Sequence, residues 1–215
     1  MMKKIVIALI AVVFTIGTMM AQKNESSITN KGDDNTLRVD QTYQGNGNKN
    51  QSSIDIQEYA DLNGLEVRQM GHNNRSNATL EEKSDENDGI VKQWGDHNDS
   101  QLKIKGDDNT IRLLQESDGN VSDINVIGYS DRNFVEVNQK QGGDHGSWVK
   151  IDGESDQNTL HVNQHGKYNW SKVELLDDSN NNFIDVHQTQ DDSKSYIKLY
   201  NSSNGNEIYV DQKGN

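Results

Sequence analysis

Carboxylates recur at one position of this sequence, two residues before an Asn that itself recurs along the chain. Asp fills the position six times and Asn twice, at Asn180 and Asn204. The six carboxylates belong to Asp33, Asp61, Asp85, Asp107, Asp131 and Asp156. A column of carboxylates could bind Ca²⁺, which prefers oxygen ligands, whereas a single Asp in a turn commonly hydrogen-bonds to the nearby backbone. The sequence leaves both roles open, and the Gly-Gly-x-Gly-x-Asp pattern of calcium-binding nonapeptide repeats is absent.

The other side chains with catalytic or metal-binding chemistry form no recognisable group. The six histidines fall at different phases of the repeat described below, so we expect them in solvated turns and faces without a metal. They are His72, His97, His145, His161, His165 and His187. No Ser/His/Asp grouping, phosphate-binding loop or pair of catalytic acids stands out, so the sequence favours a protein that is not an enzyme.

An internal repeat dominates the sequence. Eight segments share the form Asn-x-apolar-x-apolar-x-Gln, with Gly89 at the first apolar position of the third segment. The repeated Asn residues are Asn35, Asn63, Asn87, Asn109, Asn133, Asn158, Asn182 and Asn206, and the repeated Gln residues are Gln41, Gln69, Gln93, Gln115, Gln139, Gln164, Gln188 and Gln212. Successive Gln residues lie 28, 24, 22, 24, 25, 24 and 24 positions apart. This spacing is typical of a solenoid with one structural unit per repeat.

A second, looser apolar-x-apolar segment lies between the repeats, nine residues after most of the Gln residues. Its pairs are Ala78/Leu80, Leu102/Ile104, Ile124/Val126, Val173/Leu175 and Ile197/Leu199. Val149/Ile151 comes one residue later than this spacing, and Ile54/Ile56 comes four residues later. A worn copy marked by Ile28 precedes the first repeat. Each repeat therefore contains two strand segments.

Both segments alternate with a period of two, which predicts strands with one inward and one outward face. In the last repeat, Ile208 and Val210 would point inward and Tyr209 outward. One repeat has too few apolar side chains to fold alone, so neighbouring repeats have to bury them by stacking. We predict an all-β fold, a flat two-sheet parallel β-solenoid of about eight strand–turn–strand repeats, with stacked strands about 4.8 Å apart.

The repeated Asn and Gln residues also fall on the inward face. A side-chain amide carries both donors and an acceptor, so identical amides can bond to each other along the stack, as in cross-β structures. A buried amide without such partners would be costly. We therefore predict one Asn ladder and one Gln ladder, which together favour a single strand register.

The N-terminal residues 1–21 resemble a secretory signal peptide. Lys3 and Lys4 precede an apolar run from Ile5 to Ile16, and Ala21 ends a plausible cleavage site. Residues 22–34 then form an N-terminal segment with the worn half-repeat, and residues 35–215 carry the repeats. We expect the mature chain to be secreted.

The composition agrees with a secreted β-solenoid. The chain has no Cys and no Pro, and Pro is excluded from the middle of sheets because it lacks a backbone donor. Its formal net charge is −13. Nucleic-acid binding needs clustered Lys and Arg, so the charge argues against nucleic acid as a partner.

The repeats resemble those of the curli (curlin-repeat) functional amyloid family. The family motif reads in outline Ser-x5-Gln-x-Gly-x2-Asn-x-Ala-x3-Gln, and three segments match its middle with Ser in place of Ala. These segments are Gln69-x-Gly71-x2-Asn74-x-Ser76, Gln93-x-Gly95-x2-Asn98-x-Ser100 and Gln164-x-Gly166-x2-Asn169-x-Ser171. Asn replaces the leading Ser in every repeat, and an apolar residue such as Ile104 replaces the closing Gln.

The resemblance implies a major or minor subunit of an extracellular fibre at the bacterial cell surface, with roles in biofilm and adhesion. Its implied partners are further copies of itself, other curli-type subunits or a nucleator, and an outer-membrane secretion channel with accessory proteins. The last repeat runs into Lys-Gly-Asn215 without a polar cap, so we expect open ends and head-to-tail growth. A soluble, monomeric solenoid adhesin and a fibre-nucleating or capping subunit are the alternatives.

Overall fold

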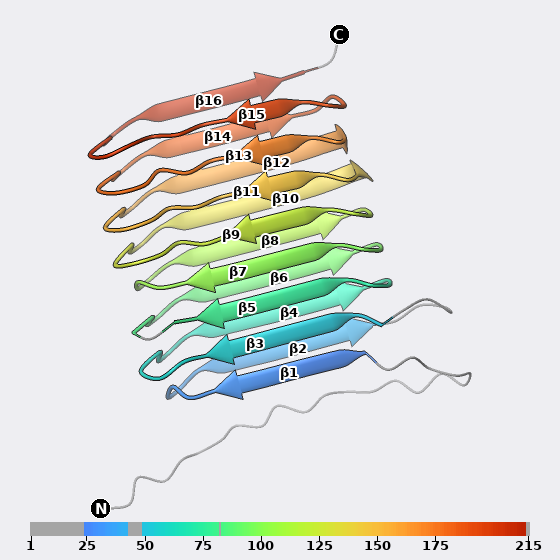
Figure 1. Cartoon of the computed structure of the whole chain (residues 1–215), viewed down its shortest axis with the longest axis vertical. Coiled ribbons are helices and arrows are strands. Elements are labelled where there is room, and N and C mark those ends of the chain that lie inside the picture. The colour runs from blue at the N-terminus through green and yellow to red at the C-terminus, as the bar shows by residue number, and fades with distance from the viewer. Residues whose placement is uncertain (1–23, 43–48, 82, 214–215) are drawn as a thin grey trace, which may run out of the picture.

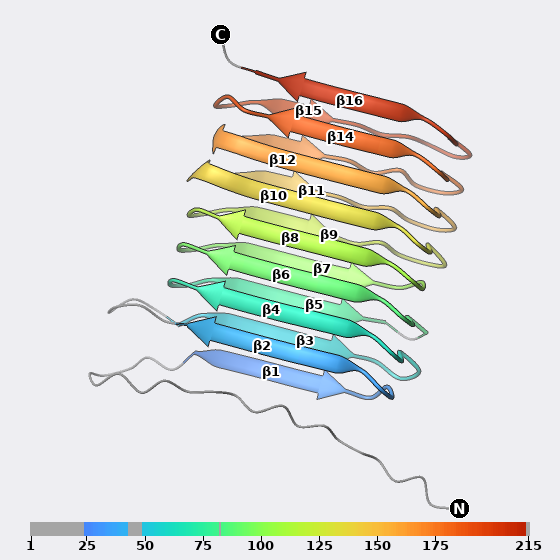
Figure 2. The same cartoon turned by 180° about the vertical axis from the view of Figure 1, so that it is seen from behind.

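The computed structural model describes residues 24–42, 49–81 and 83–213, and these residues form a stack of eight coils (Figure 1). Each coil contributes one strand to each of two eight-stranded sheets, which confirms the predicted β-solenoid. The odd-numbered strands form one sheet, in front in Figure 1, and the even-numbered strands form the other, in front in Figure 2. We call them the odd sheet and the even sheet. The predicted signal segment, residues 1–21, lies outside the described residues.

The strands follow the two segments of each repeat. The odd sheet contains β1 (Glu25–Asn30), β3 (Gln51–Ile56), β5 (Arg75–Leu80), β7 (Asp99–Ile104), β9 (Val121–Ile124), β11 (Gly146–Trp148), β13 (Trp170–Lys172) and β15 (Lys194–Tyr196). The even sheet contains β2 (Thr36–Thr42), β4 (Gly64–Met70), β6 (Asp88–Trp94), β8 (Thr110–Glu116), β10 (Phe134–Gly143), β12 (Thr159–Lys167), β14 (Phe183–Gln188) and β16 (Glu207–Gln212).

All neighbouring strands are parallel, and equivalent repeat positions lie side by side. Val137 of β10 lies between Leu113 of β8 and Val162 of β12. Ile28 of β1 pairs with Ile54 of β3, so the worn copy before the first repeat is a strand of the solenoid. Because side chains alternate between faces, this register keeps every inward residue in a column of equivalent residues.

The connecting arcs and one bulge absorb the uneven repeat lengths. Between β10 and β12 the register shifts by one residue at Gln141, which adopts a positive φ of 55°. This bulge explains why Val149 comes one residue late. The spacing of 22 residues between Gln93 and Gln115 arises in the short arc at residues 105–108. Gly106 in this arc has a φ of 104°, which residues with a side chain rarely adopt.

A single apolar column fills the space between the two sheets. It combines inward residues of both sheets, and those of the central coils, such as Leu113, Ile124 and Val137, are at most 1% exposed. The third repeat has Gly89 at an inward position, where the side chains of Leu65 and Leu102 occupy the space that a larger residue would need. Neighbouring coils thus close the core around this glycine.

Candidate functional site: stacked ladders and two open ends

The repeated Asn residues form a continuous hydrogen-bonded ladder. Each backbone N–H and each Nδ2 donates to the Oδ1 of the Asn one coil earlier, as Asn158 does to Asn133 at 2.9 and 3.1 Å. The same pair of bonds joins Asn35 to Asn63 and continues to Asn206. All of these donors point toward the N-terminal end of the stack, so the ladder has a direction.

The repeated Gln residues form a second ladder, which runs the other way. Each Nε2 donates to the Oε1 of the Gln one coil later, from Gln41 to Gln69 at 2.7 Å through to Gln188 and Gln212 at 2.9 Å. The same Nε2 also donates to a backbone carbonyl at the start of the odd strand, as Gln139 does to Val121. The Gln column therefore joins the coils along the stack and also joins the two sheets.

The repeated carboxylates lie in the arcs that lead from odd to even strands. The backbone N–H of each donates to the Oδ1 of the next one along, for instance Asp85 to Asp107 at 2.9 Å and Asp107 to Asp131 at 2.8 Å. The same contact joins Asp33 to Asp61, Asp61 to Asp85 and Asp131 to Asp156, and it continues into Asn180 and Asn204. These contacts are those of a turn residue that accepts a backbone hydrogen bond.

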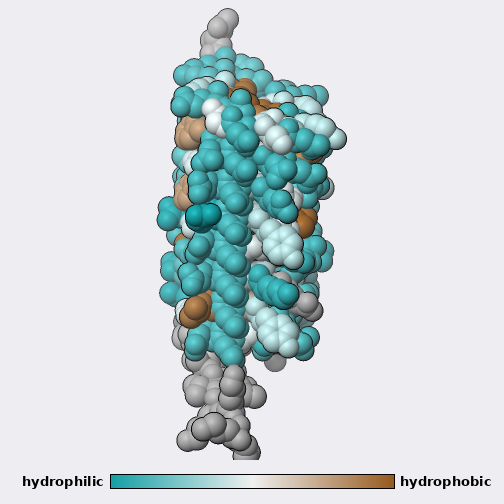
Figure 3. Space-filling model, turned by 90° about the vertical axis from the view of Figure 1, so that its left-hand side faces the viewer, coloured by the Kyte–Doolittle hydropathy of each residue, from teal (hydrophilic) through white to brown (hydrophobic). Residues whose placement is uncertain are grey.

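A residue in the left-handed region follows each of these turn residues. Leu62 and Arg132 have φ values of 58° and 54°, and their N–H groups donate to the carbonyls of Asp33 and Asp107 in the preceding coil. A non-glycine residue at positive φ is strained, so these bonds between coils help to hold the arc in shape. Figure 3 shows the edge formed by the arcs, with a hydrophilic column along its length.

Burial raises the pKa of Asp107, which lies in the middle of the column. The neighbouring carboxylates of Asp131 and Asp85 act in the same direction, and the hydrogen bond from the Asp85 N–H opposes them. Within the described part of the chain, no group of three or more His, Cys, Asp or Glu residues is arranged to hold a metal ion.

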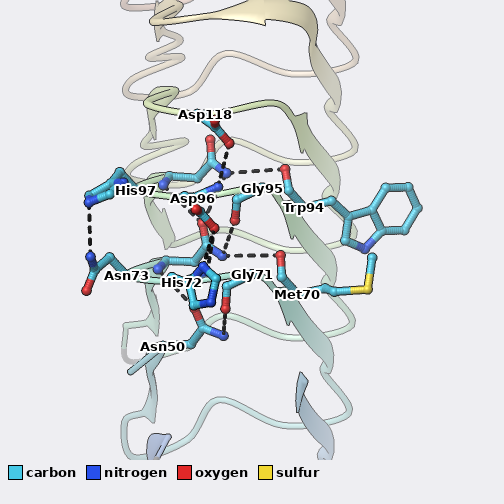
Figure 4. Close-up of polar contacts among 12 residues, drawn as sticks. Asn50, Met70, Gly71, His72, Asn73, Trp94, Gly95, Asp96, His97 and Asp118 are labelled. Atoms are coloured by element: carbon cyan, nitrogen blue, oxygen red, sulfur yellow. Dashed lines mark hydrogen bonds and ion pairs between the residues drawn. The ribbon is translucent and has the colours of Figure 1, made fainter. Parts of the chain in front are cut away.

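A third ladder, which the sequence analysis missed, lies in the arcs that lead from even to odd strands. The N–H of Asn98 donates to the Oδ1 of Asn74, and Asn120 repeats the contact with Asn98, both at 3.0 Å. The sequence pattern that could have predicted this ladder is an Asn five residues after several of the repeated Gln residues. Beside it, Gly71 and Gly95 of neighbouring coils adopt φ values of 119° and 104° (Figure 4).

His145 takes the place of Asn in this third ladder. Its side chain is 1% exposed, so the expectation of a solvated histidine is wrong at this position. Its N–H donates to Asn120 Oδ1 at 3.2 Å, and its Nε2 lies 3.3 Å from the Lys140 carbonyl oxygen. Burial lowers the pKa of His145, and the carbonyls of Lys140 and Gln141 oppose this shift. The other five histidines are exposed or half-buried.

The two ends of the stack expose strand edges. In the described residues, β1 and β2 have no strand on their outer side at one end, and β15 and β16 have none at the other. Ile28 is 46% exposed, whereas Ile54 beside it is 1% exposed. Unpaired strand edges are templates for pairing with another chain, so each end offers a surface on which a further strand pair could form.

Comparison with protein-family models, with curated proteins and with solved structures found no match. The part of the chain that the structure describes contains no helix long and apolar enough to cross a membrane. The ladders and the two open ends therefore carry the functional argument.

Proposed function

We propose that this chain is a secreted structural subunit that self-assembles into extracellular curli-type amyloid fibres, which support biofilm formation and adhesion. The observation that carries the proposal is the equivalence of the coils. The sixteen strands of the described residues lie in two parallel, in-register sheets, and no described strand covers the outer edges of the terminal coils. A coil added at either end would therefore pair with nearly the same surface that an internal coil meets in its neighbour.

The in-register amide ladders are a feature of cross-β assemblies. Soluble solenoids commonly cover their terminal coils with polar caps. Here the coils at both ends keep inward apolar residues in partial contact with solvent, among them Leu37, Val39, Ile208 and Val210. Adding a coil removes this apolar surface from water, which is favourable.

Location and partners rest on the resemblance to the curlin repeat and on the signal-like N-terminus. We expect the subunit to be exported through an outer-membrane secretion channel and to add to copies of itself. Other curli-type subunits or a nucleator would be further partners at the bacterial surface.

The test is thioflavin-T kinetics on the purified chain from Gln22 to Asn215, with electron microscopy of the end point. We expect fibres, a lag phase, and a shorter lag when preformed fibre fragments are added. A β-rich protein that stays monomeric and thioflavin-negative after long incubation would contradict self-assembly. It would favour the alternatives of a monomeric solenoid adhesin or of a capping subunit.

A further inference from the structure

The two ends of the solenoid carry opposite halves of the same hydrogen-bond pattern. In the Asn ladder, donors point toward the N-terminal end, so Asn206 leaves an acceptor Oδ1 at one end and Asn35 leaves a donor N–H at the other. In the Gln ladder the sense is reversed, so Gln212 presents Nε2 and Gln41 presents Oε1. Both ladders can continue only when unlike ends meet.

The turn residues at the positions from Asp33 to Asn204, which we call the turn column, have the same polarity as the Gln ladder. Its N–H groups donate to the residue one coil later, so the Asn204 N–H faces the end formed by β15 and β16. The Asp33 carboxylate faces the opposite end, because its own N–H donates to Asp61. If unlike ends meet, the Asn204 N–H can donate to the Asp33 carboxylate. If like ends met, two N–H donors or two carboxylates would face each other.

Charges on the outer face of the odd sheet also match. The first outward position of each odd strand forms a column that begins with Glu25 beside Gln51 and ends with Trp170 beside Lys194. Continuing the column by one coil brings Lys194 beside Glu25 of another copy. Opposite charges directly across neighbouring strands are stabilising.

The even sheet gives a second set of neighbours. Its columns start at Thr36, Leu37 and Arg38 of β2 and end at Glu207, Ile208 and Tyr209 of β16. Stacking in register would place Ile208 against Leu37 in the core, and Arg38 over the ring of Tyr209. A cation over a ring one coil away already occurs on the odd sheet, where Lys172 Nζ lies 5.3 Å from the centre of the Tyr196 ring.

One column brings like charges together. It would place Asp40 beside Asp211, but each already has a cation, Arg38 at 3.6 Å and Lys213 at 2.5 Å. These exposed partners and the surrounding salt screen the repulsion.

We propose that the two ends are the halves of one joint, whose occupant is a second copy of this chain. The first coil of that copy lies on the last coil, with β1 on β15 and β2 on β16. The register brings Glu25 beside Lys194 and Thr36 beside Glu207. This inference rests on the proposed self-assembly, and it adds the polarity, register and contacts of the joint.

Cysteine cross-linking tests the register, and the chain has no Cys of its own to interfere. In the joint, the Cα atoms of Thr36 and Glu207 would be about 4.8 Å apart, within the range that a disulfide spans. Tyr209 lies two residues further along, at about 8 Å from Thr36, which is too far. Fibres grown from a mixture of T36C and E207C proteins should therefore form disulfide-linked dimers under mild oxidation.

The controls for this experiment are the mixture of T36C with Y209C and the T36C protein alone. Both should give fibres with at least tenfold fewer disulfide-linked dimers. Equal cross-linking by Y209C would overturn the register, and T36C homodimers would overturn the polarity. Fibres that contain none of these links would overturn the joint.

Charge reversal tests the contact between Glu25 and Lys194. We expect E25K and K194E each to slow fibre elongation about threefold or more, because like charges then face each other in every joint. The double variant E25K/K194E should return close to the wild-type rate. This recovery could not come from a contact within one chain, because the double variant still lacks the ion pair between Glu25 and Lys49.

The matched control is the pair E58K and K92E, which makes the same charge changes outside the two terminal coils. Glu58 is exposed in an arc, and Lys92 lies between Arg68 and Leu114 in the middle of the even sheet. The control should elongate at the wild-type rate. A double reversal that stays slow while wild-type protein forms fibres would overturn the joint alone. Failure of the wild-type protein to form fibres would instead remove the proposed function.

Discussion

Each internal Asn of the first ladder satisfies several polar groups at once. Asn133 donates its N–H and Nδ2 to Asn109, and its Oδ1 accepts both donors of Asn158. These groups are almost completely buried. A buried donor without an acceptor destabilises the folded state because it has lost its hydrogen bonds to water. The ladder therefore stabilises the fold mainly by giving the donors of its own Asn residues an acceptor.

Replacing Asn133 with Ala should therefore lower the free energy of unfolding by about 3 kcal/mol, because both donors of Asn158 lose their acceptor. Urea unfolding of freshly purified protein, followed by circular dichroism, measures the change. Asn206→Ala is the control, since Asn206 is only half-buried and no described coil lies beyond it. We expect a loss of about 1 kcal/mol or less there. Equal losses at both positions would show that the ladder contributes no more than local packing.

Asp107→Asn should stabilise the protein at neutral pH. Asn fills the equivalent position at Asn180, where its Oδ1 accepts the same hydrogen bond. The pKa of Asp107 is raised by burial, so the folded state binds its proton more tightly than the unfolded state. The stability that this provides is present in acid and is lost as the pH rises through the folded pKa.

The gain from Asp107→Asn at pH 7 should be about 0.5 kcal/mol, the order of an opposed like-charge pair in a sheet. It should shrink as the pH falls toward 4, because the wild-type carboxylate then takes up its proton. Thermal unfolding at several pH values measures this. Asp107→Ala is the matched control, because it removes the charge and also the acceptor for the Asp85 N–H. Stabilisation by Ala as well as Asn would contradict a role for that hydrogen bond.

At the scale of the coil, length varies in the arcs and at one bulge near the end of β10, while the inward residues stay in their columns. The bulge at Gln141 adds a residue, and the arc at residues 105–108 is short, yet Gln115, Gln139 and Gln164 remain in one column. The strands can stay in register because the extra or missing residues fall outside the inward columns. The arcs keep their own hydrogen bonds to neighbouring coils, such as Asp85 to Asp107 and Asn98 to Asn74, and still accommodate these changes in length.

The coil that carries the bulge also contains His145, which interrupts the third Asn ladder. The histidine ring offers no oxygen to the N–H of Asn169, the next member of the ladder. His145→Asn should therefore raise the free energy of unfolding by about 1 kcal/mol at neutral pH. Chemical denaturation at pH 7.5 measures the change.

The effect of His145→Asn should grow in acid. Burial lowers the pKa of His145 in the folded protein, so the unfolded state binds the proton more readily. The stability that neutral His145 contributes is fully present above the unfolded pKa of about 6.5. It is lost as the pH drops through the folded pKa. The variant should lose less stability between pH 7.5 and 5. A pH profile for His145→Asn that is identical to the wild-type profile would contradict this role.

The sequence predicted the elements and their inward faces because both follow from a strict period of two. Asn133 and Gln139 could be assigned to ladders because they recur beside apolar positions of the same strand. His145 could not be assigned in this way. The extra residue at Gln141 moves it out of phase with Asn120, and a histidine in a turn is ordinarily solvated. The contacts of Asp107 also needed the structure, because a turn carboxylate and a calcium ligand have the same sequence pattern.

At the scale of the whole molecule, charge opposes the stacking that the ends favour. The chain has a formal net charge of −13, and the turn column places carboxylates on successive coils along one edge. Joining copies end to end would bring these columns into line. Each added copy therefore has to overcome a repulsion near the joint, which salt can screen.

The lag time of fibre formation should accordingly shorten severalfold between about 10 mM and 150 mM NaCl, as the Debye length falls from about 30 Å to about 8 Å. Mild acid should shorten the lag time too, because carboxylates with a raised pKa, such as Asp107, then become protonated and part of the repulsion is lost. Thioflavin-T kinetics measure both effects. Ca²⁺ and Mg²⁺ at equal ionic strength separate screening from specific binding, since only a calcium site in the turn column would make Ca²⁺ the more effective ion and EDTA inhibitory. A lag that responds to none of these conditions would show that charge along the stack does not limit assembly.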